Sequence, residues 1–95
     1  MKVFKTIDEK FKEIGFDKVN ENKYGVHYQR VDKDYKFVQT LYLCHKESGR
    51  HIVQSYDENL MDSKRIGNTC VGLTMYEIKL CYQKMKQMGW KMIKE

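Results

Sequence analysis

The residue types best suited to chemistry gather in one short stretch, CHKESGRH, which runs from Cys44 to His51. A thiol and two imidazoles are ligands for zinc, and they are also the parts of a nucleophile–base pair. Either chemistry requires these side chains to lie on one side of the backbone, within bonding distance of one another. The backbone around the stretch therefore decides whether it forms a site.

The flanking pattern is typical of a β-hairpin. Gly49 suits the left-handed position of a three-residue loop over 47–49. This loop places His45 opposite His51, at the roughly 5 Å Cβ separation of cross-strand neighbours. Cys44 then points to the other face, because side chains alternate along a strand. A two-residue loop would instead pair His45 with the next residue along, but it requires a positive φ at a serine.

Neither a metal site nor a catalytic pair is expected from this hairpin. Zinc needs three or four ligands, and the chain has no paired spacing such as C-x2-C or H-x3-H. His27 is expected on the face opposite to the other two histidines. It could approach Cys44 from the neighbouring strand, yet no third group is evident that would orient the imidazole. We expect no catalytic, cofactor-binding or metal-binding residues, and no enzyme activity.

The composition fits one small folded domain over 1–95. The chain is 41% hydrophobic and 33% charged, which supports a core for two layers of secondary structure. No apolar run reaches the length of a signal peptide or the roughly 20 residues of a membrane span. Three cysteines without paired spacing indicate reduced thiols. These features predict a cytoplasmic protein.

The first element is predicted to be a helix, because apolar residues recur at three- and four-residue steps from Val3 to Ile14. Thr6 with Glu9 suits a capping box, although Val3 and its neighbour favour an earlier start. A glycine followed by phenylalanine, at 15 and 16, predicts a Schellman ending. The spacing then changes to two, which predicts four strands at about 17–20, 24–31, 35–45 and 50–56.

The last element is also predicted to be a helix. Thr74 and Glu77 form a capping box, and Gly89 followed by Trp90 ends the pattern. Segment 57–72 shows no periodicity and is expected to form a mobile or functional loop, or to contain a short helix around Asn59 to Ser63. The apolar face of the helix is expected to carry Ile78, Cys81, Tyr82, Met85 and Met88.

Together these elements predict an α+β fold of order α-β-β-β-β-α. An antiparallel meander of about four strands would carry the N- and C-terminal helices packed on one face. The residues expected to face the helices are Tyr24, Val26, Tyr28, Phe37, Leu41, Leu43 and Val53.

The second sheet face is mixed and aromatic, which indicates a surface for a partner. The candidate residues are His27, Tyr42, Gln54 and Tyr56. A net charge of +5 allows a weaker alternative, in which lysines of the last helix contact a polyanion. The candidates for those contacts are Lys79, Lys84 and Lys86.

Four segments carry a family resemblance: SGRHIVQSYD (48–57), VGLTMYEIKL (71–80), FKEIGFDKV and NKYGVHYQR. They resemble small uncharacterised proteins encoded by phages and prophages of low-GC Gram-positive bacteria. The resemblance covers most of the chain and implies an accessory protein in the cytoplasm of a bacterial host, with no assigned activity.

We therefore expect a non-enzymatic protein-interaction module or homo-oligomer, without cofactor and without membrane contact. Its expected partner is a second copy or another protein. Weak nucleic-acid binding, through the C-terminal lysines and the sheet tyrosines, is the alternative.

Overall fold

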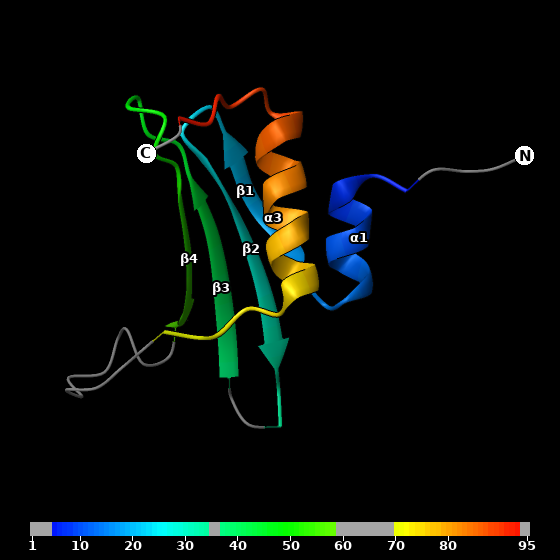
Figure 1. Ribbon diagram of the computed structural model, residues 1–95. Helices are drawn as coiled ribbons and strands as arrows, with labels where there is room; N and C mark the ends of the chain where they lie inside the picture. Colours follow the sequence, from blue (N-terminus) through cyan, green and yellow to red (C-terminus); the bar gives the residue numbers. More distant parts are fainter. Residues whose placement is uncertain (1–4, 35–36, 59–69, 94–95) are drawn as a thin grey trace, which may run out of the picture.

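The computed structural model describes residues 5–34, 37–58 and 70–93. Both helices lie on the same face of one sheet (Figure 1), whose antiparallel strands follow the order β1-β2-β3-β4. The predicted α+β meander and its element order are confirmed. Of the expected loop over 57–72, residues 59–69 lie outside the described residues. The elements are α1 (Ile7–Glu13), β1 (Asp17–Asn22), β2 (Gly25–Asp32), β3 (Phe37–Cys44), β4 (Ile52–Asp57) and α3 (Met75–Gln87).

Helix α1 begins and ends at the predicted signals. The hydroxyl of Thr6 accepts the Glu9 N–H at 3.1 Å, which satisfies one of the donors at the helix start. The Phe16 N–H donates to the carbonyl of Phe11 at 3.0 Å, and Gly15 has a φ of 97°. This is the Schellman ending that the sequence predicts. Val3, which favoured an earlier start, lies outside the described residues.

Helix α3 has the same kind of ending and a complete capping box. Thr74 and Glu77 exchange two hydrogen bonds, at 2.9 and 3.1 Å. The Trp90 N–H donates to the carbonyl of Met85 at 3.1 Å, and Gly89 has a φ of 76°. Local sequence therefore fixes both ends of this helix.

The core lies between the helices and the two central strands. The ring of Phe11 stacks on that of Tyr28 with centroids 4.2 Å apart. Three expected core residues are not buried, and one of them, Phe37, is half-buried. Tyr24 is 63% exposed, because it precedes β2 in the turn, and Val53 is 37% exposed on the last strand of the sheet. The buried apolar residues are Phe11, Phe16, Val26, Tyr28, Leu41, Leu43, Leu80 and Cys81.

The buried face of α3 differs from the prediction. Ile78 and Tyr82 were expected to pack inward, yet they are 54% and 47% exposed. Glu77 and Lys84 are buried instead, each in ion pairs with other elements of the fold. These charged partners turn α3 so that the stripe carrying Ile78 and Tyr82 faces away from the core.

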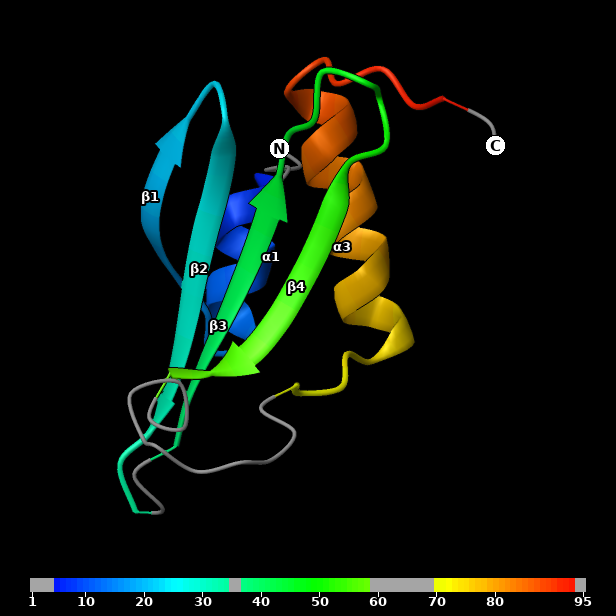
Figure 2. The same ribbon diagram turned by 90° about the vertical axis from the view of Figure 1, so that its left-hand side faces the viewer.

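The two helices lie side by side but differ in their surroundings. Helix α1 packs against β1 and α3. In Figure 2, α3 lies toward the β4 side of the sheet, whereas α1 lies toward β1. No helix in the described part of the chain is long and apolar enough to cross a membrane.

Candidate protein-binding groove

The two hairpin histidines, His45 and His51, pack against the segment that follows α3. The rings of His45 and His51 stack with centroids 4.7 Å apart, and Trp90 packs against both at 5.1 Å. Nδ1 of His51 accepts the Lys46 N–H at 3.1 Å, and its Nε2 lies 2.7 Å from the carbonyl of Lys91. Because Nδ1 of His51 accepts a hydrogen bond, the ring proton is assigned to Nε2, which donates to the carbonyl of Lys91. The imidazole therefore ties the hairpin to the segment that follows α3.

The side chain of Cys44 points away from the two histidines, because successive side chains alternate along a strand. It pairs across the sheet with Gly25, whereas His27 pairs with Tyr42 and stacks on its ring at 4.0 Å. Within residues 5–34, 37–58 and 70–93, no three His, Cys, Asp or Glu side chains are grouped closely enough to hold a metal ion.

The predicted partner residues do share one face of the sheet. His27, Tyr42 and Gln54 form one row across β2, β3 and β4, and Tyr56 lies two residues beyond Gln54. Of these four, only Gln54 is exposed, and the other three are half-buried. A hydrogen bond with Cys44 raises the pKa of the Tyr42 phenol, so this hydroxyl is partly engaged within the protein. The predicted partner residues on this face are therefore less exposed to solvent than the sequence indicates.

The predicted polyanion set is incomplete. Lys79 and Lys86 are exposed, but only 5% of the Lys84 side chain is exposed. Its ammonium group lies 2.7 Å from Glu21 and 3.2 Å from Asp8. The expectation that Lys84 contacts a polyanion is therefore wrong, because an ammonium group inside a fold must be paired. Lys84 supports the fold and does not face solvent.

The carboxylates around Lys84 are held in their charged forms. Burial alone would raise the pKa of Asp8, but hydrogen bonds from Tyr28, Lys18 and Lys84 outweigh it and lower that pKa. The Tyr28 hydroxyl is the closest of these donors, at 2.6 Å. The hydrogen bond from Lys84 likewise lowers the pKa of Glu21. Opposite charges and donors thus stabilise both anions.

A second ion pair fixes the start of α3. The guanidinium of Arg30 lies 3.0 Å from Glu77, whose side chain is 5% exposed. Arg30 also donates to Gln39 at 2.6 Å and lies 4.3 Å from the ring centroid of Phe16. Both ends of the inward stripe of α3 are therefore held by charge.

The orientation of α3 leaves open a groove that the sequence pattern did not predict. Two hollows lie end to end along β4, with volumes of about 610 and 590 Å³. On β4, Ile52 lines the first hollow and its neighbour Val53 lines the second. On α3, Tyr82 lines the first hollow and Ile78, one helical turn away, lines the second. We call this surface the β4–α3 groove. Its other apolar lining residues are Tyr56, Val71, Leu73, Met85, Trp90, Met92 and Ile93.

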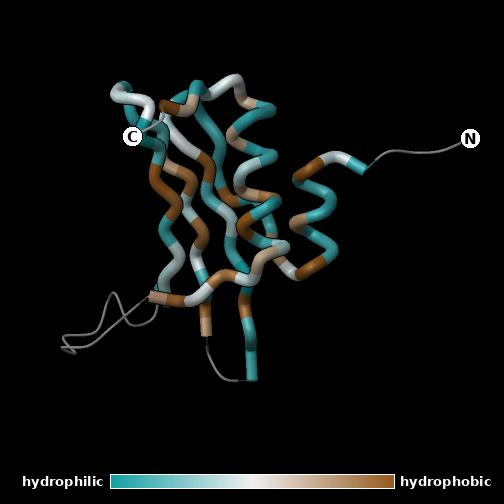
Figure 3. The backbone as a smooth tube through the Cα atoms, viewed as in Figure 1, coloured by the Kyte–Doolittle hydropathy of each residue, from teal (hydrophilic) through white to brown (hydrophobic). Residues whose placement is uncertain are grey.

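The apolar character of the groove is visible along the chain. Figure 3 shows hydrophobic residues at the start of β4, where Ile52 is 41% exposed. At that end the Ile93 N–H donates to the carbonyl of Gly49 at 3.4 Å, which brings the segment after α3 to the hairpin. In the sequence these residues are indistinguishable from core residues, because the pattern does not show which apolar stripe faces the sheet.

Comparisons of the chain with protein-family models, with curated proteins and with solved structures give no match. The groove, and not a known relative, therefore provides the clue to function.

Proposed function

We propose that the protein is a non-enzymatic module that binds another protein through the β4–α3 groove. One observation carries this proposal. Helix α3 exposes Ile78 and Tyr82 along the groove, while it directs Glu77 and Lys84 toward the protein. Two neighbouring hollows with largely apolar linings on a folded domain are typical of a binding surface.

The energetics favour a partner that covers these side chains. Fully burying a large apolar side chain contributes roughly 1.5–3 kcal/mol. Ile78 and Tyr82 are each about half exposed, so a partner gains a sizeable part of that amount at each. The ion pairs of Glu77 and Lys84 hold α3 in the orientation that presents these residues. The surface is thus formed before the partner arrives.

The accessory role that the phage-type resemblance implies is compatible with binding without catalysis. The alternative of polyanion binding has weaker support, because Lys84 is buried and only Lys79 and Lys86 of the expected set are exposed. A second copy of the chain is a less suitable occupant than another protein, because the groove is basic and so would be its copy.

The experiment uses site-specific photo-crosslinking in cells that naturally encode the protein. A photoreactive phenylalanine analogue replaces Tyr82 in the groove, or Tyr24 in the turn between β1 and β2 as the matched exposed control. We expect a discrete protein adduct from position 82 and none from position 24. The partner, once identified and purified, should then bind the wild-type protein and lose affinity for Tyr82→Ser but not for Tyr24→Ser.

Two outcomes would overturn the proposal. Equal adducts from both positions would show that position 82 is merely exposed. A nucleic-acid adduct from position 82 would restore the polyanion alternative.

A further inference from the structure

Among the described residues, the outer edge of β4 carries backbone groups that have no hydrogen-bond partner. The Val71 N–H donates to the carbonyl of Ser55 at 2.9 Å, so the carbonyl of Ser55 points away from β3. Backbone direction alternates along a strand, so Val53 also presents its N–H and its carbonyl at this outer edge. Within the described parts of the chain, no hydrogen bond reaches these two groups of Val53.

The opposite edge of the sheet is protected. Strand β1 is exposed throughout, and its pairing with β2 is interrupted by a bulge between Lys18 and Asn20. Lys18 also forms an ion pair with Glu21 along this strand. A bulge and charged side chains are the usual means by which an edge resists another strand.

Strand β4 has neither protection. Its register with β3 is continuous from Ile52 to Asp57, and no charged residue precedes Asp57. The segment at Cys70 and Val71 already pairs antiparallel with the far end of this edge. An extended backbone therefore fits beside β4, and the edge next to that segment is open from Ile52 to Gln54.

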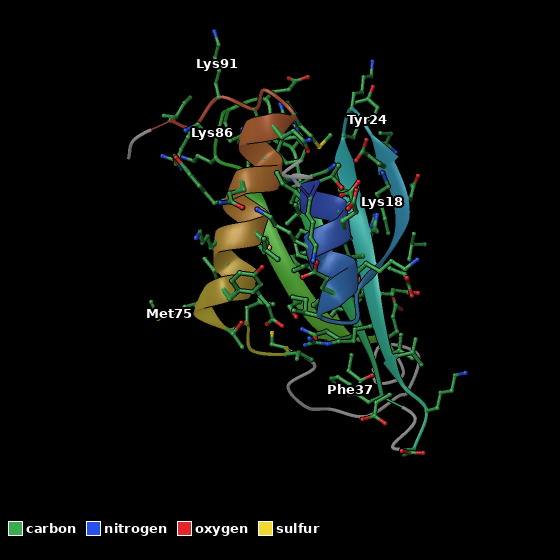
Figure 4. All side chains as sticks on the ribbon, turned by 90° about the vertical axis from the view of Figure 1, so that its right-hand side faces the viewer. Lys18, Tyr24, Phe37, Met75, Lys86 and Lys91 are labelled. Atoms are coloured by element: carbon green, nitrogen blue, oxygen red, sulfur yellow. The ribbon has the colours of Figure 1, made fainter. Side chains whose placement is uncertain are left out.

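The charges around the groove select the occupant. Among the described residues, no carboxylate lines either hollow, whereas Lys86 and Arg50 line the larger one. Figure 4 shows Lys86 projecting from the same side of α3 as Met75, away from Lys18 at the opposite side. A second copy would bring the same cations against these, and each copy has a net charge of +5. Charge complementarity therefore favours an acidic segment.

We propose that the β4–α3 groove binds an extended segment of an acidic partner protein, which adds to the sheet as a strand beside β4. This inference rests on the proposed function and names its partner class. Apolar side chains of the segment fill the hollows beside Ile52 and Ile78, and its carboxylates approach Lys86. Backbone hydrogen bonds to Val53 supply affinity, as in other cases of strand addition.

The test uses a short peptide of alternating valine and glutamate as the probe. The single tryptophan of the chain, Trp90, lines the groove and reports binding by its fluorescence. The backbone amide signal of Val53 in an NMR titration reports pairing at the edge. We expect saturable changes in both signals. A matched peptide with lysine for glutamate, and one N-methylated at alternate amides, should each bind at least about tenfold more weakly.

Protein variants separate charge from strand pairing. Lys86→Glu should reverse the preference between the glutamate and lysine peptides, whereas Lys12→Glu on α1 makes the same charge change away from the groove and should not. Val53→Pro removes a donor that does not face β3, so it should abolish binding and leave the sheet ladder complete. The N-methylated peptide tests the same pairing if this variant does not fold.

Each contrary result would overturn one part of this proposal. Equal affinity for the glutamate and lysine peptides would overturn the acidic partner, and equal affinity for the N-methylated peptide would overturn strand addition. A salt-insensitive dimer in light scattering that competes with the peptide would assign the groove to a second copy. If Tyr82 cross-links a protein that is neither acidic nor extended at the contact, this inference fails while the proposed function stands.

Discussion

The ammonium group of Lys84 on α3 lies 2.7 Å from the carboxylate of Glu21 on β1. The same group contacts Asp8 on α1, 76 positions away in the sequence. These two contacts join the first and last helices to the edge of the sheet. They also fix which face of α3 is buried, and so they determine where the groove lies.

Replacing Lys84 with alanine should destabilise the protein strongly. Loss of one partner leaves two carboxylates without their shared cation, and such changes at fully buried pairs cost roughly 3–5 kcal/mol. Asp8 and Glu21 are 32% and 35% exposed, so solvent screens part of this loss. We expect a fall of about 2 kcal/mol in the free energy of unfolding, measured in urea.

The matched control is Lys86→Ala, which removes an exposed lysine from the same helix. Its effect should stay within about 0.5 kcal/mol. Equal losses from the two variants would show that the ion pairs of Lys84 contribute little.

Stability should decrease in acid because Asp8 and Glu21 have lowered pKa values in the folded state. Their ordinary values are 3.8 and 4.5. A group with a lowered folded pKa contributes fully above its ordinary value, and the contribution is lost as the pH falls through the folded value. The melting temperature should therefore change little from pH 7 to about 5 through these groups, and decrease below that range.

The double variant Asp8→Asn, Glu21→Gln provides the comparison. It should be less stable than the wild type at pH 7, and its melting temperature should depend less on pH below 4.5. An unchanged acid slope would assign the loss of stability to other carboxylates.

Gly25→Ala should destabilise the sheet. A Cβ atom at this position would lie 2.5 Å from Cε1 of Tyr42 and 2.7 Å from the carbonyl oxygen of Leu43. The backbone oxygen cannot move without disturbing the β2–β3 pairing, so the cost should reach about 1–3 kcal/mol. Gly72→Ala is the control, because a Cβ there meets no atom within 4 Å. Thermal unfolding of both variants measures the difference.

Cys81 should resist thiol reagents in the native protein. Burial, with a further contribution from the charge of Glu77, raises the pKa of its thiol to about 12. Very little reactive thiolate is then present at pH 8. Mass spectrometry after alkylation should show modification at the exposed Cys70 long before Cys81, whereas in urea the two rates should converge. Rapid native labelling of Cys81 would contradict its burial.

Local signals in the sequence predict most of the fold. The caps at Thr6 and Thr74 and the left-handed glycines at 15, 49 and 89 are where the pattern places them. The hairpin register follows from Gly49, and it stacks His45 on His51. Each of these features depends on residues a few positions apart, so a single sequence contains the information.

The orientation of α3 could not be predicted in the same way. Periodicity identifies an apolar stripe through Ile78 and Tyr82, but it gives no sign that Glu77 and Lys84 find partners elsewhere. Those partners, Arg30 among them, come from distant segments and meet α3 only in the folded chain. The groove was missed for this reason, since it is formed by the stripe that the ion pairs turn away from the core.

The division of α3 into two stripes also has an evolutionary consequence. Substitutions at Ile78 or Tyr82 alter the lining of the groove without touching the ion pairs of Glu77 and Lys84. Recognition and stability are thus encoded by different positions of one helix. Descendants of this chain can therefore exchange one partner for another by a few substitutions, at little cost to the scaffold.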